Sequence, residues 1–195
     1  MLNLDSIQKK YKDNLILADI TFQITNPGLY VLHGINGSGK STIIKIITGI
    51  IYKSAGSITH NLNISYLPDK FSMPKLMKAK SYLKYVIDLK SSEYDKYLSE
   101  YQIPNKRIGD LSKGNQQKLG LLQILSKNAD CYILDEPIDG LDDYAKKLFK
   151  SKIINLIQND KIVILSLHNK TFLNDLKPTI YKVEEGRIYE KRKRA

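Results

Sequence analysis

The sequence predicts an α/β protein in which a largely parallel sheet is interrupted by a helical insertion. Short apolar segments alternate with segments of helical spacing toward both ends of the chain, which is the order typical of parallel sheets. A glycine-rich loop joins one of these strands to the helix that follows it. The middle of the chain has helical spacing only. We therefore expect one domain over residues 1–195, with an α/β core at about 1–69 and 127–195 and a helical subdomain at about 70–126.

Composition restricts the class of protein. Hydrophobic residues make up 42% of the chain and charged residues 26%, as in a globular domain rather than a disordered one. Cys131 is the single cysteine, which excludes an internal disulfide, and we expect a cytosolic protein. The first residues lack the basic-then-apolar order of a signal peptide, and no apolar stretch approaches the roughly 20 residues of a membrane span. A role at a membrane therefore requires a partner.

The formal charge of +11 raises the question of nucleic-acid binding. The lysines, however, are scattered, and only residues 191–194 form a basic run. A dispersed excess of this kind is typical of a solvated surface, which also suits anionic lipid headgroups nearby. We do not expect a nucleic-acid partner.

The predicted elements follow from apolar spacing and turn residues. Strands are expected over Leu2 to Ile24, with a turn at Asn26-Pro27-Gly28, and then at 29–32, 64–67, 131–134, 162–167, 180–183 and 187–189. Helices are expected at 43–50, at 78–101 with a tyrosine-rich packing face, at about 116–126 and at 145–157. Cys131 is expected to be a buried apolar residue of its strand.

The loop over residues 34–42 predicts a phosphate-binding site. It reads Gly-Ile-Asn-Gly-Ser-Gly-Lys-Ser-Thr and fits the pattern G-x-x-x-x-G-K-[ST] between a strand and a helix. Its glycines let backbone N–H groups approach phosphate oxygens, and the helix directs its positive dipole end to the same place. Lys40 is expected to reach the β and γ phosphates, and Ser41 to bind Mg²⁺. The expected nucleotide contacts are Asn36, Gly37, Ser38, Gly39, Lys40, Ser41 and Thr42.

Two acids end the strand at 131–134. Because ligands bind at the carboxyl ends of parallel strands, Asp135 is placed to hold Mg²⁺. Glu136 is placed to orient and deprotonate an attacking water molecule.

The segment from Leu111 to Lys118, with the sequence LSKGNQQK, resembles the LSGGQ signature of ABC (ATP-binding cassette) ATPases. Ser112 and Gly114 keep the positions that face nucleotide in that family, while Lys113 and Asn115 depart from its pattern. The segment from Pro137 to Asp142 resembles the D-loop that follows the family's second acidic motif. Together with the phosphate loop, these motifs extend the resemblance over nearly the whole chain.

The resemblance implies further roles. His168, at the end of the next strand, looks like the switch histidine that touches the γ-phosphate, and Tyr11 lies where the family places the aromatic that stacks on adenine. One position departs from the family: Asp69 follows the strand at 64–67 where a glutamine is usual. As a carboxylate, Asp69 is expected to bind the metal or the attacking water. It also adds negative charge beside Mg²⁺.

The resemblance implies a RecA-like P-loop NTPase core with an antiparallel β layer and an inserted helical subdomain. It also implies that two cassettes, identical or different, enclose ATP and Mg²⁺ between them and separate after hydrolysis. Glu136, His168, Lys40 and Asp69 would be the catalytic residues, and Ser41, Asp135 and Asp69 the metal ligands. The function implied is the ATP-hydrolysing subunit of an ABC transporter, peripheral on the cytoplasmic face of the membrane and bound to a separate transmembrane permease.

Two alternatives are retained at this point. One is an ABC ATPase that is not linked to transport, and the other is a regulatory module that ATP locks without hydrolysis. We further expect the permease to dock on residues 70–80 and the helical insert, where Phe71, Met73, Leu76 and Met77 lie among lysines. The competing interpretation is that these four side chains close the small core of the insert.

Overall fold

A computed structural model describes residues 1–88, 90, 93–168 and 171–191. Its elements run, in chain order, β1 Leu2–Tyr11, β2 Asn14–Ile24, β3 Gly28–His33, α1 Lys40–Ile47, β4 Ala55–His60, β5 Ile64–Leu67, α2 Ala79–Val86, α3 Glu93–Glu100, η1 Ile108–Asp110, α4 Lys113–Leu125, β6 Cys131–Asp135, α5 Asp143–Gln158, β7 Ile162–Leu167, η2 Thr171–Leu176, β8 Thr179–Glu184 and β9 Arg187–Lys191. The α/β fold with an inserted helical segment, predicted from the sequence, is confirmed.

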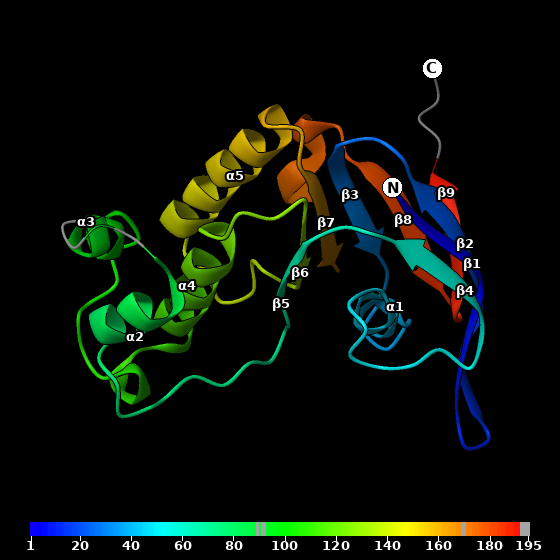
Figure 1. Ribbon diagram of the computed structural model, residues 1–195, viewed down its shortest axis with the longest axis horizontal. Helices are drawn as coiled ribbons and strands as arrows, with labels where there is room; N and C mark the ends of the chain where they lie inside the picture. The colour runs from blue at the N-terminus through cyan, green and yellow to red at the C-terminus, as the bar shows by residue number, and fades with distance from the viewer. Residues whose placement is uncertain (89, 91–92, 169–170, 192–195) are drawn as a thin grey trace.

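The described strands form one nine-stranded sheet in the order β4-β1-β2-β9-β8-β3-β7-β6-β5. Strands β8, β3, β7, β6 and β5 pair in parallel, whereas β4, β1 and β2 pair antiparallel and form the expected antiparallel layer. In Figure 1 the antiparallel strands lie at one end of the molecule and helices α2, α3 and α4 at the other. The parallel strands between them end at the phosphate loop and the two acids.

Alternation along the central strands builds two separate cores. Cys131 and Ile133 of β6 pack with α1 and the antiparallel strands, whereas Tyr132 and Leu134 pack with α4 and α5 on the other face. Successive side chains of a strand point to opposite faces, so a strand covered on both sides is apolar throughout. Burial raises the pKa of the Cys131 thiol to about 12, which agrees with its predicted role as a core residue.

The helical segment has a third core of its own. Met73, Tyr82, Tyr94, Tyr101 and nine other side chains from residues 79–122 make up its buried part, with Leu119 and Leu122 of α4 facing it. Leu121 and Ile124 of the same helix face the sheet core instead. Helix α4 therefore belongs to both parts of the molecule.

Three details differ from the prediction. The run expected as one helix at 78–101 forms two helices, α2 ending at Val86 and α3 beginning at Glu93; Leu89 lies outside the described residues. Helix α4 begins at Lys113, ahead of the expected start, because Ser112 caps it. The edge strand β4 was not predicted, because its residues are mostly exposed and lack apolar alternation.

The four apolar residues considered for docking divide between the two interpretations. Met73 is buried in the helical core, and Phe71 and Met77 are half-buried against it. Leu76 is 83% exposed, as is Tyr85 on the adjacent helix α2. Among the described residues, no helix combines the length and the apolar character that crossing a membrane requires.

Candidate functional site

The phosphate loop joins β3 to α1 at the carboxyl edge of the parallel sheet. Gly37 and Gly39 have φ angles of 79° and 108°, in the region that favours glycine. A Cβ atom at residue 39 would also lie 2.6 Å from Leu17 Cδ2. Gly39 is the N-cap of α1 and supplies no side-chain bond to it, so the first N–H groups of α1 are available to a ligand.

Lys40 is buried beneath this loop. Its side chain is 5% exposed, and Nζ donates hydrogen bonds to the carbonyl oxygens of Gly34 (2.9 Å) and Ile35 (3.1 Å). The same ammonium lies 3.4 Å from Oε1 of Glu136. Ser38 Oγ is also buried and has no protein partner within the described residues. An unpartnered hydroxyl beside a buried ammonium fits an anionic ligand.

A cavity of about 740 Å³ opens in front of the loop. Its lining consists of Tyr11, Ile16, Ile35, Asn36, Gly37, Gly39, Lys40, Ser41, Thr42, Asp69, Glu136, Asp139 and His168. The structure thus brings together most of the site residues predicted from the sequence. Tyr11, at the end of β1, is 49% exposed, and Lys9 Nζ lies 4.4 Å from its ring centroid on one face.

Asp135 ends β6 just behind the cavity and is 1% exposed. Its Oδ1 accepts a hydrogen bond from Ser166 Oγ, and Ser166 Oγ accepts one from the Glu136 N–H at 2.9 Å. Within the described residues Asp135 forms no ion pair with a lysine or arginine. Since buried carboxylates are usually paired or bound to a cation, Asp135 fits Mg²⁺, which prefers oxygen ligands, and the Ser41 hydroxyl on the cavity lining offers a second oxygen.

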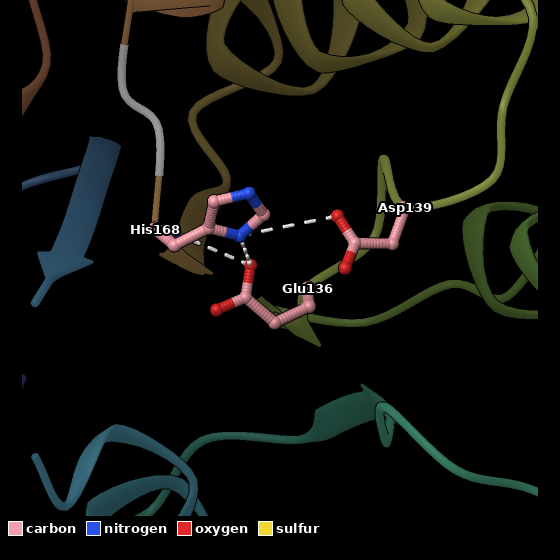
Figure 2. Close-up of side chains that lie close together, drawn as sticks. All are labelled: Glu136, Asp139 and His168. Carbon is pink, nitrogen blue, oxygen red and sulfur yellow. Dashed lines mark hydrogen bonds and ion pairs between the residues drawn. The ribbon is translucent and has the colours of Figure 1, made fainter. Parts of the chain in front are cut away.

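Glu136, His168 and Asp139 meet at the wall of this cavity. Glu136 Oε2 lies 3.2 Å from His168 Nδ1 and accepts a hydrogen bond from the His168 N–H at 3.3 Å. Asp139 Oδ1 is 4.0 Å from the same ring nitrogen. Figure 2 shows the three side chains pointing toward one another. Glu136 has a φ of 48°, which is uncommon for a residue with a side chain and turns the chain sharply after β6.

Asp69 is exposed and lies on the same cavity. The pKa of Tyr66, on β5, is raised to about 12. Burial is the largest cause, and the negative charges of Asp135 and Asp69 add to it. The two carboxylates therefore contribute to one negative region at the carboxyl end of β5 and β6.

Ser112 and Gly114 do not line this cavity. Ser112 caps α4 by accepting a hydrogen bond from the Asn115 N–H at 3.2 Å. Gly114 packs against the D-loop, since a Cβ atom there would lie 2.7 Å from the Gly140 carbonyl oxygen. The structure therefore keeps the two signature residues apart from the phosphate loop of the same chain.

Two residues of this region were missed by the sequence analysis. Asp139 belongs to the D-loop segment, but its place beside His168 depends on the turn at Glu136. Lys118, 4% exposed, pairs with Asp142 at 2.6 Å and so joins α4 to the N-cap of α5. A lysine within a largely apolar helix was the one available signal, and it does not identify a partner.

The parallel sheet, the phosphate loop and the acids beyond β6 define a nucleotide-binding α/β protein. The sequence profile of the ABC transporter family matches residues 17–139. An uncharacterized ABC transporter ATP-binding protein of Methanocaldococcus jannaschii is 30% identical over 196 residues, which cover 95% of this chain and 75% of that protein. A cytochrome c biogenesis ATP-binding export protein of Reclinomonas americana is 32% identical over 200 residues, covering 91% and 88%.

Among solved structures, a dimeric ATP-binding cassette bound to ADP and phosphate superimposes with a TM-score of 0.85 over the full length of both chains, at 20% identity. The chain belongs to the ABC transporter family and is one of its ATP-binding cassettes. An ABC ATPase outside transport and a regulator that only binds ATP are the less favoured alternatives.

Proposed function

We propose that this chain binds MgATP in the cavity at the phosphate loop, hydrolyses it, and thereby drives a transporter. The observation that supports this most directly is the meeting of Lys40, Glu136 and His168 on one cavity of about 740 Å³. A lysine for phosphate, a carboxylate for water and a histidine beside them are the groups that phosphoryl transfer to water requires.

In the proposed binding mode, the phosphates lie on the loop from Asn36 to Thr42. Lys40 supplies the charge that faces the β and γ phosphates, and Ser38 and the N–H groups at the start of α1 supply hydrogen bonds. Tyr11 stacks on adenine with the ring face that Lys9 does not cover.

In the proposed hydrolysis, Glu136 accepts a proton from the attacking water as its oxygen bonds to the γ-phosphorus. The bond from that phosphorus to the bridging oxygen breaks, and ADP and phosphate leave. His168 touches the γ-phosphate and, through the contacts at Oε2, holds Glu136 in place. Asp135 and Ser41 hold Mg²⁺, with Asp69 near it, and when bound that ion neutralises charge on the phosphates.

A second cassette, identical or different, completes each site. Ser112 and Gly114 lie outside this chain's own nucleotide cavity, so they are free to face the nucleotide bound by a partner. ATP held by both cassettes favours the closed pair, and loss of the γ-phosphate removes that preference.

The membrane role is proposed through a separate permease subunit, which places the chain peripherally on the cytoplasmic face. The docking surface includes Leu76 and Tyr85, both 83% exposed, on the helical subdomain at about 70–126. The division into this subdomain and a RecA-like core at about 1–69 and 127–195 remains our proposal. Its support is the separate hydrophobic core of the helical segment.

Glu136→Gln tests the proposal. The variant keeps the shape of the side chain but cannot accept the proton, so hydrolysis should fall on the order of a hundredfold or more. ATP binding should persist, and a dimer should accumulate on ATP, as measured by phosphate release and by light scattering. Glu190→Gln is the matched control, because Glu190 is exposed on β9 and outside the cavity lining. Hydrolysis by Glu136→Gln at the wild-type rate would remove Glu136 from the mechanism.

A further inference from the structure

The proposed hydrolysis gives no role to Asp139, although its carboxylate faces the same point as Glu136 and His168 (Figure 2). Glu136 and Asp139 come from the turn after β6, and His168 follows β7, the neighbouring strand. One ligand atom from each of the three residues lies within 4.8 Å of the other two. The distance from His168 Nδ1 to Glu136 Oε2 is 3.2 Å, and the distance from His168 Nδ1 to Asp139 Oδ1 is 4.0 Å.

These distances are close to those of a metal site. Zinc binds imidazole nitrogen and carboxylate oxygen at about 2.0–2.2 Å, so neighbouring ligands of a tetrahedral site lie about 3.3 Å apart. The pair formed by His168 and Glu136 already has this spacing. Asp139 needs to move by less than about 1 Å relative to His168, and its side chain is 54% exposed, so it is free to rotate.

The donor set determines the kind of ion. Mg²⁺ takes oxygen ligands and retains several waters, whereas an imidazole nitrogen beside carboxylates favours divalent transition metals such as Zn²⁺. His168 is 51% exposed and lies on the cavity wall, which gives an ion a path of entry. Glu136 is 12% exposed, and its other carboxylate oxygen, Oε1, pairs with Lys40. One of the three ligands is therefore already in position before the ion binds.

We propose that Glu136, Asp139 and His168 form a binding site for a divalent transition-metal ion, Zn²⁺ in particular, in the nucleotide-free protein. Three protein ligands leave one position for water, as in zinc sites that are not closed. This site differs from the Mg²⁺ site at Ser41 and Asp135 in both its residues and its donor atoms. The expected consequence, which rests on the proposed function, is inhibition of ATP hydrolysis. The bound ion occupies Glu136 and His168, the carboxylate and the histidine that hydrolysis needs.

The direct test measures the metal alone. Nucleotide-free, full-length protein without a histidine tag is titrated with Zn²⁺ in competition with a chromogenic chelator, in buffer containing millimolar Mg²⁺. The wild type should bind one Zn²⁺ per chain at this site. Asp139→Asn should weaken that binding at least about tenfold, because loss of even an outer-shell partner costs 10- to 100-fold in affinity.

Asp143→Asn is the matched control, since its carboxylate is 96% exposed, lies on the same segment and is not part of the cluster. Its Zn²⁺ affinity should equal that of the wild type, and His168→Gln should lose binding as Asp139→Asn does. Equal affinities for wild type and Asp139→Asn, or no binding to the wild type in the presence of Mg²⁺, would overturn the site.

An ATPase measurement separates the site from the proposed function. Zn²⁺ should inhibit the wild type, and Asp139→Asn should need at least about tenfold more Zn²⁺ for half-inhibition, in line with its weaker binding. If Zn²⁺ binds through Asp139 and hydrolysis continues at its normal rate, the metal site stands, and the roles of Glu136 and His168 in hydrolysis are refuted.

Discussion

The starts of helices α1 and α4 both carry serine and glycine, but they differ in what holds them. At α1, Gly39 adopts a left-handed conformation, no side chain caps the helix, and the loop opens onto the large cavity. At α4, Ser112 caps the helix. The Gln116 amide then donates to the Ile108 and Leu111 carbonyl oxygens at 3.0 and 3.1 Å.

The first turns of α4 are also fixed to the segment after β6. Gln117 donates to the Pro137 carbonyl oxygen at 3.2 Å, and Lys118 pairs with Asp142 at 2.6 Å. One helix start therefore leaves its N–H groups to a ligand, whereas the other is braced by its own chain. Two similar motifs thus serve different purposes: α1 forms a site by itself, and α4 presents a surface of fixed shape.

The largest effect is expected at the start of α1, from Lys40→Ala. The variant loses charge-assisted hydrogen bonds worth about 1.5–3 kcal/mol each, so ATP affinity should fall about ten- to hundredfold. Calorimetric titration with MgATP measures this change. Lys45→Ala, in the last turn of the same helix, is the matched control and should bind as the wild type does. Unchanged affinity in Lys40→Ala would mean that the loop does not hold the phosphates.

Gly114→Ala tests the other helix start. The new Cβ atom would lie 2.7 Å from the Gly140 carbonyl oxygen, so either α4 or the D-loop must shift. In the Glu136→Gln background, ATP-dependent dimerisation should weaken on the order of tenfold, equivalent to about 1.4 kcal/mol. The ATP affinity of the single chain should stay within about twofold, because residue 114 is outside the cavity. If ATP affinity fell as much as dimerisation, the start of α4 would contribute to nucleotide binding in its own chain, and the proposed difference between the two helix starts would be wrong.

Asp142→Asn should have the smallest effect. The Lys118 ammonium, and to a smaller extent the Ala145 N–H, lower the pKa of Asp142, whose side chain is 53% exposed. Asparagine can still cap α5 but leaves Lys118 without its counter-charge, so the free energy of unfolding should drop by about 1 kcal/mol at pH 7.

The pH dependence identifies the cause of that loss. A carboxylate whose pKa is lower in the folded chain than its unfolded value of about 3.9 stabilises fully above about pH 5, and this contribution disappears as pH falls through the folded pKa. The difference in free energy of unfolding between the wild type and Asp142→Asn, measured by urea unfolding, should therefore become smaller below about pH 4. Asp143→Asn, 96% exposed, should show a much smaller gap. A gap that stays constant on acidification would rule out the ion pair.

The sequence predicted best where a local rule acts alone. The loop at 34–42 and the strand at 131–134 were placed because glycine conformations and strand apolarity are local properties. The break between α2 and α3 was missed because tyrosines keep a helical spacing on both sides of it. There the folding of the two helices around one core, through Tyr82, Tyr94 and Leu98, overrides the periodicity.

The site was predicted by residue type more readily than by contact. The positions of Glu136 and His168 followed from strand ends, but the contact of Glu136 with Lys40 requires the pairing of β3 with β7 and of β7 with β6. No local signal identified the partners of Asp139 and Lys118, because these partners are brought to them by a backbone turn and by helix packing. Long-range contacts of this kind depend on tertiary structure, which spacing along one chain does not contain.

Helix α4 also has a mechanical consequence. Near its C-terminal end it is attached to the sheet, where Ser65 Oγ donates to the Ile124 carbonyl oxygen at 3.1 Å and Leu121 and Ile124 are buried in the sheet core. Its 13 residues make a rigid arm roughly 20 Å long. A tilt of roughly 10° about the end attached to the sheet moves Ser112, at the N-terminal end, together with the segment after β6 that braces it, by roughly 3 Å, which is the length of a hydrogen bond. A small rotation of α4 where it is attached to β5 is thus enough to make or break a hydrogen bond at Ser112.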